Sequence, residues 1–172
     1  MPTLRVNKEF NDQTYFITMT VNYWAKIFDR HNRWNILANS LIYCQGNMGL
    51  KIYAYVFMLN HLHLIIQSPD VSGFIRRFKS YTARELLKNI RETEPEILDL
   101  FKFQDGHFEF WRKSNKPQLI VTDHFFEQKL NYIHNNPVKK KYVEYPEEWK
   151  WSSASWYENG KQGGIQIDSM EI

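Results

Sequence analysis

Residues 58–66 read MLNHLHLII, an apolar run that contains two histidines one residue apart, His61 and His63. A short apolar run bounded by polar residues is typical of a buried strand, so we expect a strand over 61–67. Alternate residues of a strand point to opposite faces of the sheet. The sequence therefore predicts that both imidazoles project from one face and that the leucines between them project from the other.

Strand and helix signals alternate on both sides of this run. Strands are expected over 14–21 (TYFITMTV) and 51–58 (KIYAYVFM), with shorter ones over 107–111 and 118–121. Helices are expected over 31–48, over 68–90 with Ser68 as its cap and Pro69 at its first position, and from 122 or 123 to a point near Pro137. The order β-α-β-β-α-β-α predicts an α+β fold, a ferredoxin-like or RRM-like antiparallel sheet with helices packed on it.

The 172 residues fit one domain, which we place at 1–160, followed by a polar and flexible tail at 161–172. Hydrophobic residues make up 43% of the chain, enough for a packed core, and the single cysteine excludes a disulfide framework. The N-terminus lacks the apolar segment of a signal peptide, and no run is long enough to span a membrane. We therefore expect a cytoplasmic protein with no membrane partner.

Positive charge gathers in one segment of the chain, residues 102–141. The net charge is +3, whereas residues 102–141 contain eight Lys or Arg and four Asp or Glu. Such a segment favours an anionic partner, although a mildly basic protein is weak evidence by itself.

The histidine pair suggests a metal site. Two imidazoles on one face of a strand can chelate a single divalent ion, provided that a third ligand comes from elsewhere in the chain. A cysteine-based zinc site is impossible with one cysteine. The alternative is that His61 and His63 are ordinary side chains of a half-exposed sheet surface.

A second informative stretch is LNYIHNNPVKKKYV, residues 130–143. Tyr132 and Asn136 are four residues apart and share one face of the expected helix. The Asn136 amide oxygen suits a hard cation such as Mg²⁺ or Mn²⁺, and the lysines at 139–141 could hold phosphates. The alternative is a packing tyrosine followed by a solvated basic turn.

Taken together, MLNHLHLII and the later YIHNNPVKKKYVEYPEEWKWSSASWY resemble the REP-associated tyrosine transposases, which belong to the single-tyrosine, His-hydrophobic-His group. The likeness extends over most of the chain. It implies that His61 and His63 bind a metal ion, that Asn136 is its third ligand, and that Tyr132 is the nucleophile. Leu59 departs from the family pattern, because proline is common at that position.

The resemblance further implies a Mg²⁺- or Mn²⁺-dependent enzyme, nucleoid-associated in the cytoplasm, that cleaves and rejoins single-stranded or hairpin DNA. Cleavage would pass through a 5′-phosphotyrosine, at palindromic repeats, in a monomer or a homodimer. Metal binding needs neutral imidazoles, so activity should fall below about pH 6. Two alternatives remain: a module of the same fold that binds DNA or RNA without cutting, and a metal-dependent hydrolase that uses water.

DNA contacts are expected from basic residues on either side of the tyrosine helix: Arg112, Lys113, Lys116, Lys139, Lys140 and Lys141. Three tryptophans, Trp111, Trp149 and Trp151, could stack on unpaired bases. Large aromatic side chains are usually buried, so the same three could belong to the core instead.

Overall fold

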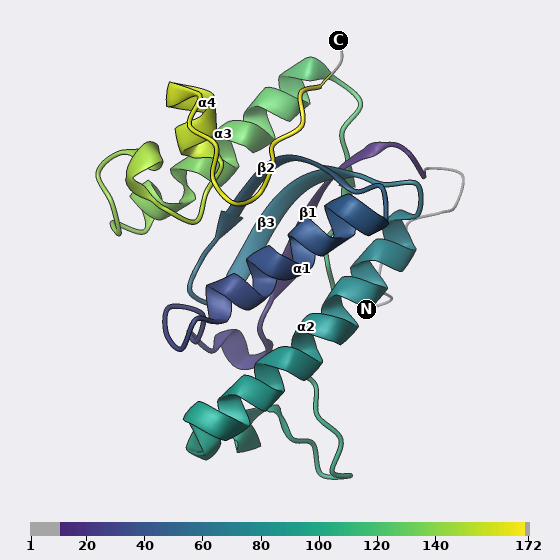
Figure 1. Cartoon of the computed structure of the whole chain (residues 1–172), viewed down its shortest axis with the longest axis vertical. Coiled ribbons are helices and arrows are strands. Elements are labelled where there is room, and N and C mark those ends of the chain that lie inside the picture. Colours follow the sequence, from purple (N-terminus) through teal and green to yellow (C-terminus); the bar gives the residue numbers. More distant parts are fainter. Residues whose placement is uncertain (1–10, 171–172) are drawn as a thin grey trace.

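The computed structural model describes residues 11–170, and its centre is a four-stranded antiparallel sheet (Figure 1). Its strands are β1 (Thr14–Thr20), β2 (Lys51–Phe57), β3 (His61–Gln67) and β4 (Gln118–Leu119), in the spatial order β2-β3-β1-β4. The helices are α1 (Arg33–Asn47), α2 (Val71–Thr93), α3 (Asp123–Lys139) and α4 (Ala154–Asn159). Short 3₁₀ turns are η2 (Asn22–Trp24), η3 (Pro95–Phe101) and η4 (Pro146–Glu148). The predicted α+β, ferredoxin-like architecture is confirmed.

The two faces of the sheet carry different helices. Helices α1 and α2 cover one face, and α3 lies across the other (Figure 1). Leu62 and Leu64 of β3 are fully buried in the core under α1 and α2. Ile65 joins a smaller core beneath α3, on the face from which His61 and His63 project. The alternation predicted from the sequence is therefore confirmed.

Two helices begin later than the sequence predicted. The cap of α2 is Asp70, whose carboxylate accepts a 2.9 Å hydrogen bond from the Gly73 backbone N–H, so Ser68 and Pro69 lie outside the helix. Helix α2 also continues to Thr93 instead of ending at residue 90. Helix α1 begins at Arg33, because His31 and Asn32 have left-handed φ angles of 55° and 58° that a right-handed helix cannot include.

The strand predicted over 107–111 is wrong. This segment makes only isolated bridges, from Phe108 to Lys102 and from Trp111 to Val21. It is extended because Phe110 and Trp111 are buried at the end of the sheet, but it has no continuous ladder. The strand expected over 118–121 is present only at Gln118–Leu119.

Helix α3 does not end at Pro137, as the rule for residues that precede proline predicted. It continues through Pro137 to Lys139. Proline lacks the N–H that would bond the carbonyl four residues earlier, but so near the helix end it removes only one bond. The Lys140 N–H still donates to the Asn136 carbonyl at 3.1 Å.

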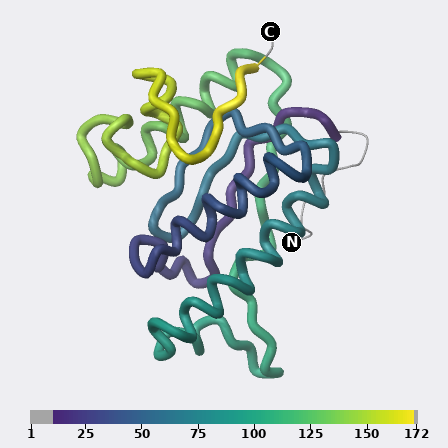
Figure 2. Tube along the Cα trace, in the orientation of Figure 1, coloured from purple at the N-terminus to yellow at the C-terminus, as the bar shows by residue number. Residues whose placement is uncertain are grey.

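The tail expected to be flexible packs against the sheet over its described part. Ile165 and Ile167 are buried in the larger core. The Ile52 N–H donates to the Asp168 carboxylate at 2.9 Å, and the Asp168 N–H donates to the Ile52 carbonyl at 2.8 Å. Figure 2 shows this yellow segment running beside the edge of the sheet. The tail therefore covers the free edge of β2, which would otherwise be open to pairing with another chain.

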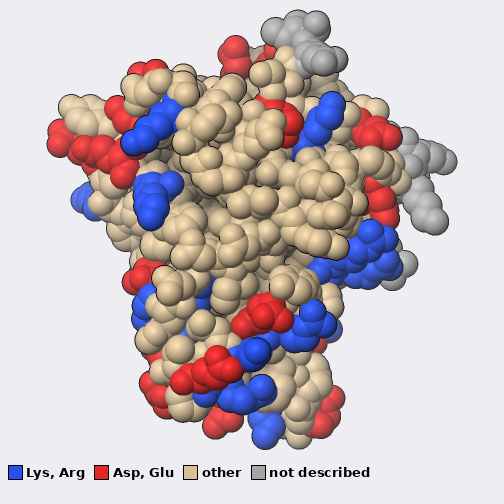
Figure 3. All heavy atoms as spheres, in the orientation of Figure 1, with Lys and Arg blue, Asp and Glu red and all other residues tan. Residues whose placement is uncertain are grey.

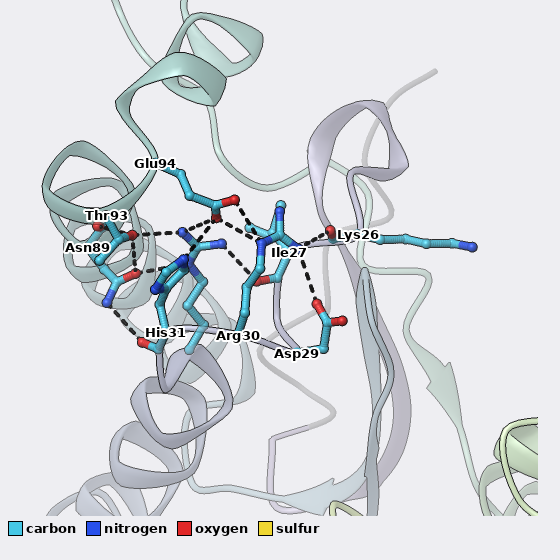
Figure 4. Close-up of polar contacts among 9 residues, drawn as sticks. Lys26, Ile27, Asp29, Arg30, His31, Asn89, Thr93 and Glu94 are labelled. Carbon is cyan, nitrogen blue, oxygen red and sulfur yellow. Dashed lines mark hydrogen bonds and ion pairs between the residues drawn. The ribbon is translucent and has the colours of Figure 1, made fainter.

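A buried arginine fastens the loop after η2 to the end of α2. Arg33 is fully buried, and its guanidinium donates to the Ile27 carbonyl at 3.0 Å and lies 2.7 Å from the Glu94 carboxylate. Figure 4 shows Asn89 and Thr93 of α2, and Glu94 just after it, gathered against this loop. A buried charge is tolerated only when it is paired and hydrogen-bonded, so the contacts fix the path of the loop.

We expect Glu94→Ala to lower the free energy of unfolding by about 3 kcal/mol, because it leaves the buried Arg33 charge uncompensated. Glu92→Ala, an exposed carboxylate on the same helix, is the matched control and should cost less than about 0.5 kcal/mol. Urea unfolding followed by circular dichroism measures both. Equal losses in the two variants would contradict a stabilising role for Glu94.

Candidate functional site

A pocket of about 460 Å³ opens where β1 and β3 meet the second half of α3. Its lining includes the residues that the sequence singled out for chemistry, namely His61, His63, Tyr132, Asn136, Lys139 and Lys140. Other lining residues come from β1, from the loop after η2 and from the β2–β3 turn, and among them are Thr18, Thr20, Trp24, Lys26 and Asn60. Segments far apart in the sequence thus converge on one cavity.

His63 is buried and held from the neighbouring strand. The register of β1 and β3 sets Thr18 directly opposite His63, and the Thr18 hydroxyl lies 2.8 Å from the His63 Nδ1. The other ring nitrogen, Nε2, is buried and has no hydrogen-bond partner among residues 11–170. A metal-ligating histidine usually has one ring nitrogen hydrogen-bonded to the protein, which leaves the other nitrogen available to the metal ion.

His61 is arranged in the same way. Its Nδ1 lies 2.7 Å from the side-chain oxygen of Asn60, an acceptor, so Nδ1 carries the proton and Nε2 keeps its lone pair. The centroids of the two imidazole rings are 4.8 Å apart. The predicted pairing of His61 and His63 on one face is therefore present in the structure.

Both imidazoles are neutral over the physiological range. Burial, with a smaller contribution from the Lys140 charge, lowers the pKa of His61 to about 4. Burial, together with the charges of His61, Lys129 and Lys116, lowers the pKa of His63 to about 3. Neutral imidazole is the form that binds a metal ion. The limit of about pH 6 expected from the reference histidine pKa is thus too high for these side chains.

Tyr132 projects from α3 towards the histidine pair. Its ring centroid is 5.2 Å from that of His63, with the two planes at 70°, and 5.9 Å from that of Phe16. The Lys129 ammonium lies 5.6 Å from the centre of the Tyr132 ring. The side chain is 45% exposed, so a substrate can reach its hydroxyl.

Asn136 completes a donor set that could hold a divalent ion. It is buried one turn beyond Tyr132 and lines the same pocket. The amide oxygen suits a hard cation such as Mg²⁺ or Mn²⁺, and the two imidazole nitrogens favour Mn²⁺ over Mg²⁺. The unpartnered Nε2 of His63 is free to bind such an ion. In residues 11–170 no group of three or more His, Cys, Asp or Glu side chains could hold a metal ion.

Comparison with known proteins identifies the family. The model of the family described as "Transposase IS200 like" matches residues 9–136, which is most of the chain. The chain belongs to the family of IS200-like transposases. The resemblance stated from the sequence is thereby confirmed.

Two individual relatives agree with this assignment. A Haemophilus influenzae protein described as a REP-associated tyrosine transposase is 29% identical over 104 residues, which cover 58% of this chain and 56% of that one. The chain thus spans little more than half the length of this relative. The solved structure of a REP-associated tyrosine transposase bound to a REP hairpin superposes with a TM-score of 0.71 at 19% identity, over 100% of this chain and 95% of that one.

The predicted basic residues divide into those near the pocket and those away from it. Lys139 and Lys140 line the pocket. Arg112 stacks its guanidinium 4.1 Å from the centre of the Trp24 ring, which also lines it. Lys116 is near enough to influence His63. The structure does not bring Arg112, Lys113, Lys116 or Lys141 into the pocket lining, and Lys113 lies 3.6 Å from the Glu109 carboxylate.

The tryptophans considered for base stacking serve packing instead. Trp111 is buried and donates its indole N–H to the Thr82 hydroxyl at 3.0 Å. Trp149 donates to the Phe57 carbonyl at 2.9 Å, and Trp151 stacks on the Phe57 ring. No local sequence pattern shows that Trp24, Lys26 and Lys129 approach the histidines, so these residues were not predicted.

The face that Figure 3 shows, which carries α1 and α2, has basic and acidic side chains interspersed. It therefore presents no surface of one sign to an anionic partner. No helix of residues 11–170 combines the length and the apolar character that crossing a membrane requires.

The histidine environment predicts a dependence of stability on pH. Because the folded-state pKa of His63 lies below the unfolded value of about 6.5, only the unfolded chain gains this proton as the pH falls below 6.5. The free energy of unfolding should then fall by about 1.4 kcal/mol per pH unit for each such histidine. Above pH 6.5 the contribution vanishes.

Urea unfolding between pH 5 and 7 in EDTA should show a shallower dependence in His63→Asn than in the native sequence. His124→Asn, at an exposed histidine at the start of α3, is the matched control and should keep the native slope. Identical slopes for all three proteins would show that burial does not perturb His63.

Proposed function

We propose that this protein is a metal-dependent transposase that cleaves and rejoins single-stranded DNA through a covalent bond to Tyr132. The observation that carries the proposal is the position of the Tyr132 ring, 5.2 Å from that of His63 and in one pocket with His61 and Asn136. A half-exposed phenol beside two neutral, oriented imidazoles is unusual for a tyrosine that serves packing alone. All of these residues belong to a single chain, so the proposed site needs no second subunit.

In the proposed reaction the Tyr132 oxygen attacks the phosphorus, and the bond from phosphorus to the 3′ oxygen breaks. The products are a 5′-phosphotyrosine and a free 3′-hydroxyl, and the proton that leaves the phenol is balanced by the one that the 3′ oxygen gains. The covalent bond preserves the phosphoester, so a second 3′-hydroxyl can reverse the step and join new ends without ATP. The Lys129 ammonium, 5.6 Å from the centre of the Tyr132 ring, adds positive charge to the surroundings of the attacking group.

Under this proposal His61 and His63 would hold Mg²⁺ or Mn²⁺ through Nε2, and Asn136 through its amide oxygen. Such an ion, when bound, would polarise the scissile phosphate and offset the charge of the transition state. Thr18 and Asn60 keep the two imidazoles in orientation. The lysines that line the pocket attract the phosphate backbone of the substrate: Lys26, Lys139 and Lys140.

The proposed substrate is a hairpin formed by a palindromic repeat, with a single-stranded flank that enters the pocket. This choice is supported by the fold that the chain shares with a transposase solved on a REP hairpin. The alternatives are a module that binds DNA or RNA hairpins without cutting and a hydrolase that uses water. The half-exposed tyrosine beside the histidine pair favours the transposase over both.

Replacement of Tyr132 by phenylalanine removes only the attacking oxygen. We expect the covalent adduct with a hairpin oligonucleotide to form more than about 10³-fold more slowly, because no other group replaces a nucleophile. Binding of the same hairpin should change by less than about threefold. The measurement is a denaturing gel with Mn²⁺ and a label at the 3′ end of the DNA, since that fragment stays attached to a 5′-phosphotyrosine.

Tyr43→Phe is the matched control, because Tyr43 is 64% exposed on α1, across the sheet from the pocket. It should form the adduct at the native rate. Cleavage that persists in Tyr132→Phe would support the water-dependent hydrolase. A native protein that binds the hairpin and never cleaves it would support the binding module.

Thr18→Val tests the metal site without changing a ligand. The substitution keeps the shape of the side chain and removes the hydroxyl beside the His63 Nδ1, so Mn²⁺ affinity should fall about 10- to 100-fold. Thr14→Val makes the same change four residues earlier on β1, outside the pocket lining, and should bind Mn²⁺ as the native protein does. Electron paramagnetic resonance of free Mn²⁺ measures both, and equal affinities would count against the proposed role of Thr18.

A further inference from the structure

The turn that holds Trp24 has an unfavourable backbone and exposed aromatic side chains. Tyr23 and Trp24 have φ angles of 58° and 51°, a left-handed conformation that residues with a Cβ rarely adopt twice in succession. Their side chains are 63% and 60% exposed. Strain and exposed apolar surface gain nothing for folding, and strained residues cluster where a ligand is bound.

Trp24 differs from the other tryptophans of the chain. All six lie within residues 11–170, and Trp24 is the exposed one, whereas the other five are buried or half-buried. The Arg112 guanidinium lies 4.1 Å from the centre of its ring. An indole supported on a guanidinium is preformed for stacking against a further planar group.

The surroundings of Trp24 match the chemistry of a nucleotide. The ring lines the pocket that contains His61 and Tyr132, and the Lys26 and Lys140 side chains line it too. An aromatic surface among cations is how proteins bind unpaired nucleotides, because the base stacks while the phosphates meet positive charge. At about 460 Å³ the pocket has room for one nucleotide beside the tyrosine.

The position of Trp24 is fixed on both sides of the turn. Before it, the Val21 N–H donates to the Asn60 carbonyl at 2.9 Å, and the Asn22 side chain donates to the Glu109 carbonyl at 2.8 Å. Beyond it, the Arg30 guanidinium donates to the Lys26 carbonyl at 2.9 Å. Figure 4 shows the Lys26 side chain extending away from the polar contacts around Arg30 and Glu94. The turn is therefore held in place before DNA arrives.

We propose that Trp24 is a stacking platform for one unpaired base that flanks the phosphate presented to Tyr132. This inference rests on the proposed function, because it assigns a subsite to the same pocket. The ligand class is single-stranded DNA, and the contact is to the face of a base and not to its edge. The subsite therefore accepts any base, with larger stacking surfaces preferred.

The test compares two fluorescein-labelled single strands of about 12 nucleotides, one of mixed sequence and one of equal length with an abasic backbone. Fluorescence anisotropy in EDTA gives the dissociation constants without cleavage. Trp24→Leu should weaken binding of the base-bearing strand by roughly 5- to 150-fold and leave the abasic strand within about twofold. Trp24→Phe should retain most of the difference between the two strands.

Tyr23→Leu is the matched control, since Tyr23 shares the left-handed turn and the exposure of Trp24 but does not line the pocket. It should bind both strands as the native protein does. The proposal is overturned if Trp24→Leu weakens both strands equally, if it weakens neither, or if the native protein does not prefer the base-bearing strand.

These outcomes separate the subsite from the proposed function. If Trp24→Leu loses base-dependent binding while the native protein never forms an adduct, stacking stands and the transposase activity fails. If the native protein forms the adduct and Trp24→Leu binds normally, the activity stands and the subsite fails.

Discussion

The antiparallel register between β1 and β3 determines the site, because it sets Thr18 opposite His63 and Thr20 opposite His61. Directly opposed side chains lie about 4.5–5.5 Å apart, close enough for the Thr18 hydroxyl to reach His63. A slip of one residue would turn both histidines into the core under α1 and α2. Leu62 and Leu64 prevent that slip, since it would move them out of this core. Apolar packing on one face of β3 thus positions the polar chemistry on the other.

The site carries costs that packing elsewhere must offset. An unpartnered buried nitrogen such as the His63 Nε2 destabilises a fold by about 1–3 kcal/mol. The left-handed turn at Tyr23 and Trp24 adds about 1–2 kcal/mol for each residue. Trp24 and His63 both line the pocket, although left-handed residues also occur outside it, for example at His31 and Asn32. Unfavourable local structure at the wall of a cavity favours a binding site prepared for its ligand.

The sequence predicted those features that depend on local periodicity. Alternation in β3 identified the two faces, and the four-residue spacing of Tyr132 and Asn136 placed both on one side of α3. The features that it missed depend on long-range contacts. Ile165 and Ile167 are buried because β2 offers a free edge, which a polar tail does not reveal. Likewise, nothing near Trp24 in the chain indicates that a turn would bring it to the histidines.

The tryptophans show that long-range contacts can also exclude a role that the sequence suggested. Trp111 lies in the basic segment 102–141, and Trp149 and Trp151 follow it, so all three were candidates for contact with DNA. Their indole N–H groups or rings are instead committed to Thr82 and Phe57. The composition gives the number of tryptophans in a chain. Only the packing in the folded structure determines which of their rings is exposed to a ligand.

Asn60 links the turn at Trp24 to the chemistry of His61. The Trp24 carbonyl can only accept a hydrogen bond, so the Asn60 amide nitrogen, 3.1 Å away, must face it. The Asn60 oxygen then faces His61, and the proton of that imidazole must sit on Nδ1. Nε2 is left with its lone pair directed into the pocket. The conformation of the turn at Trp24 thus sets the tautomer of His61. Trp24, the proposed base-stacking residue, and His61, the proposed metal ligand, are both hydrogen-bonded to Asn60.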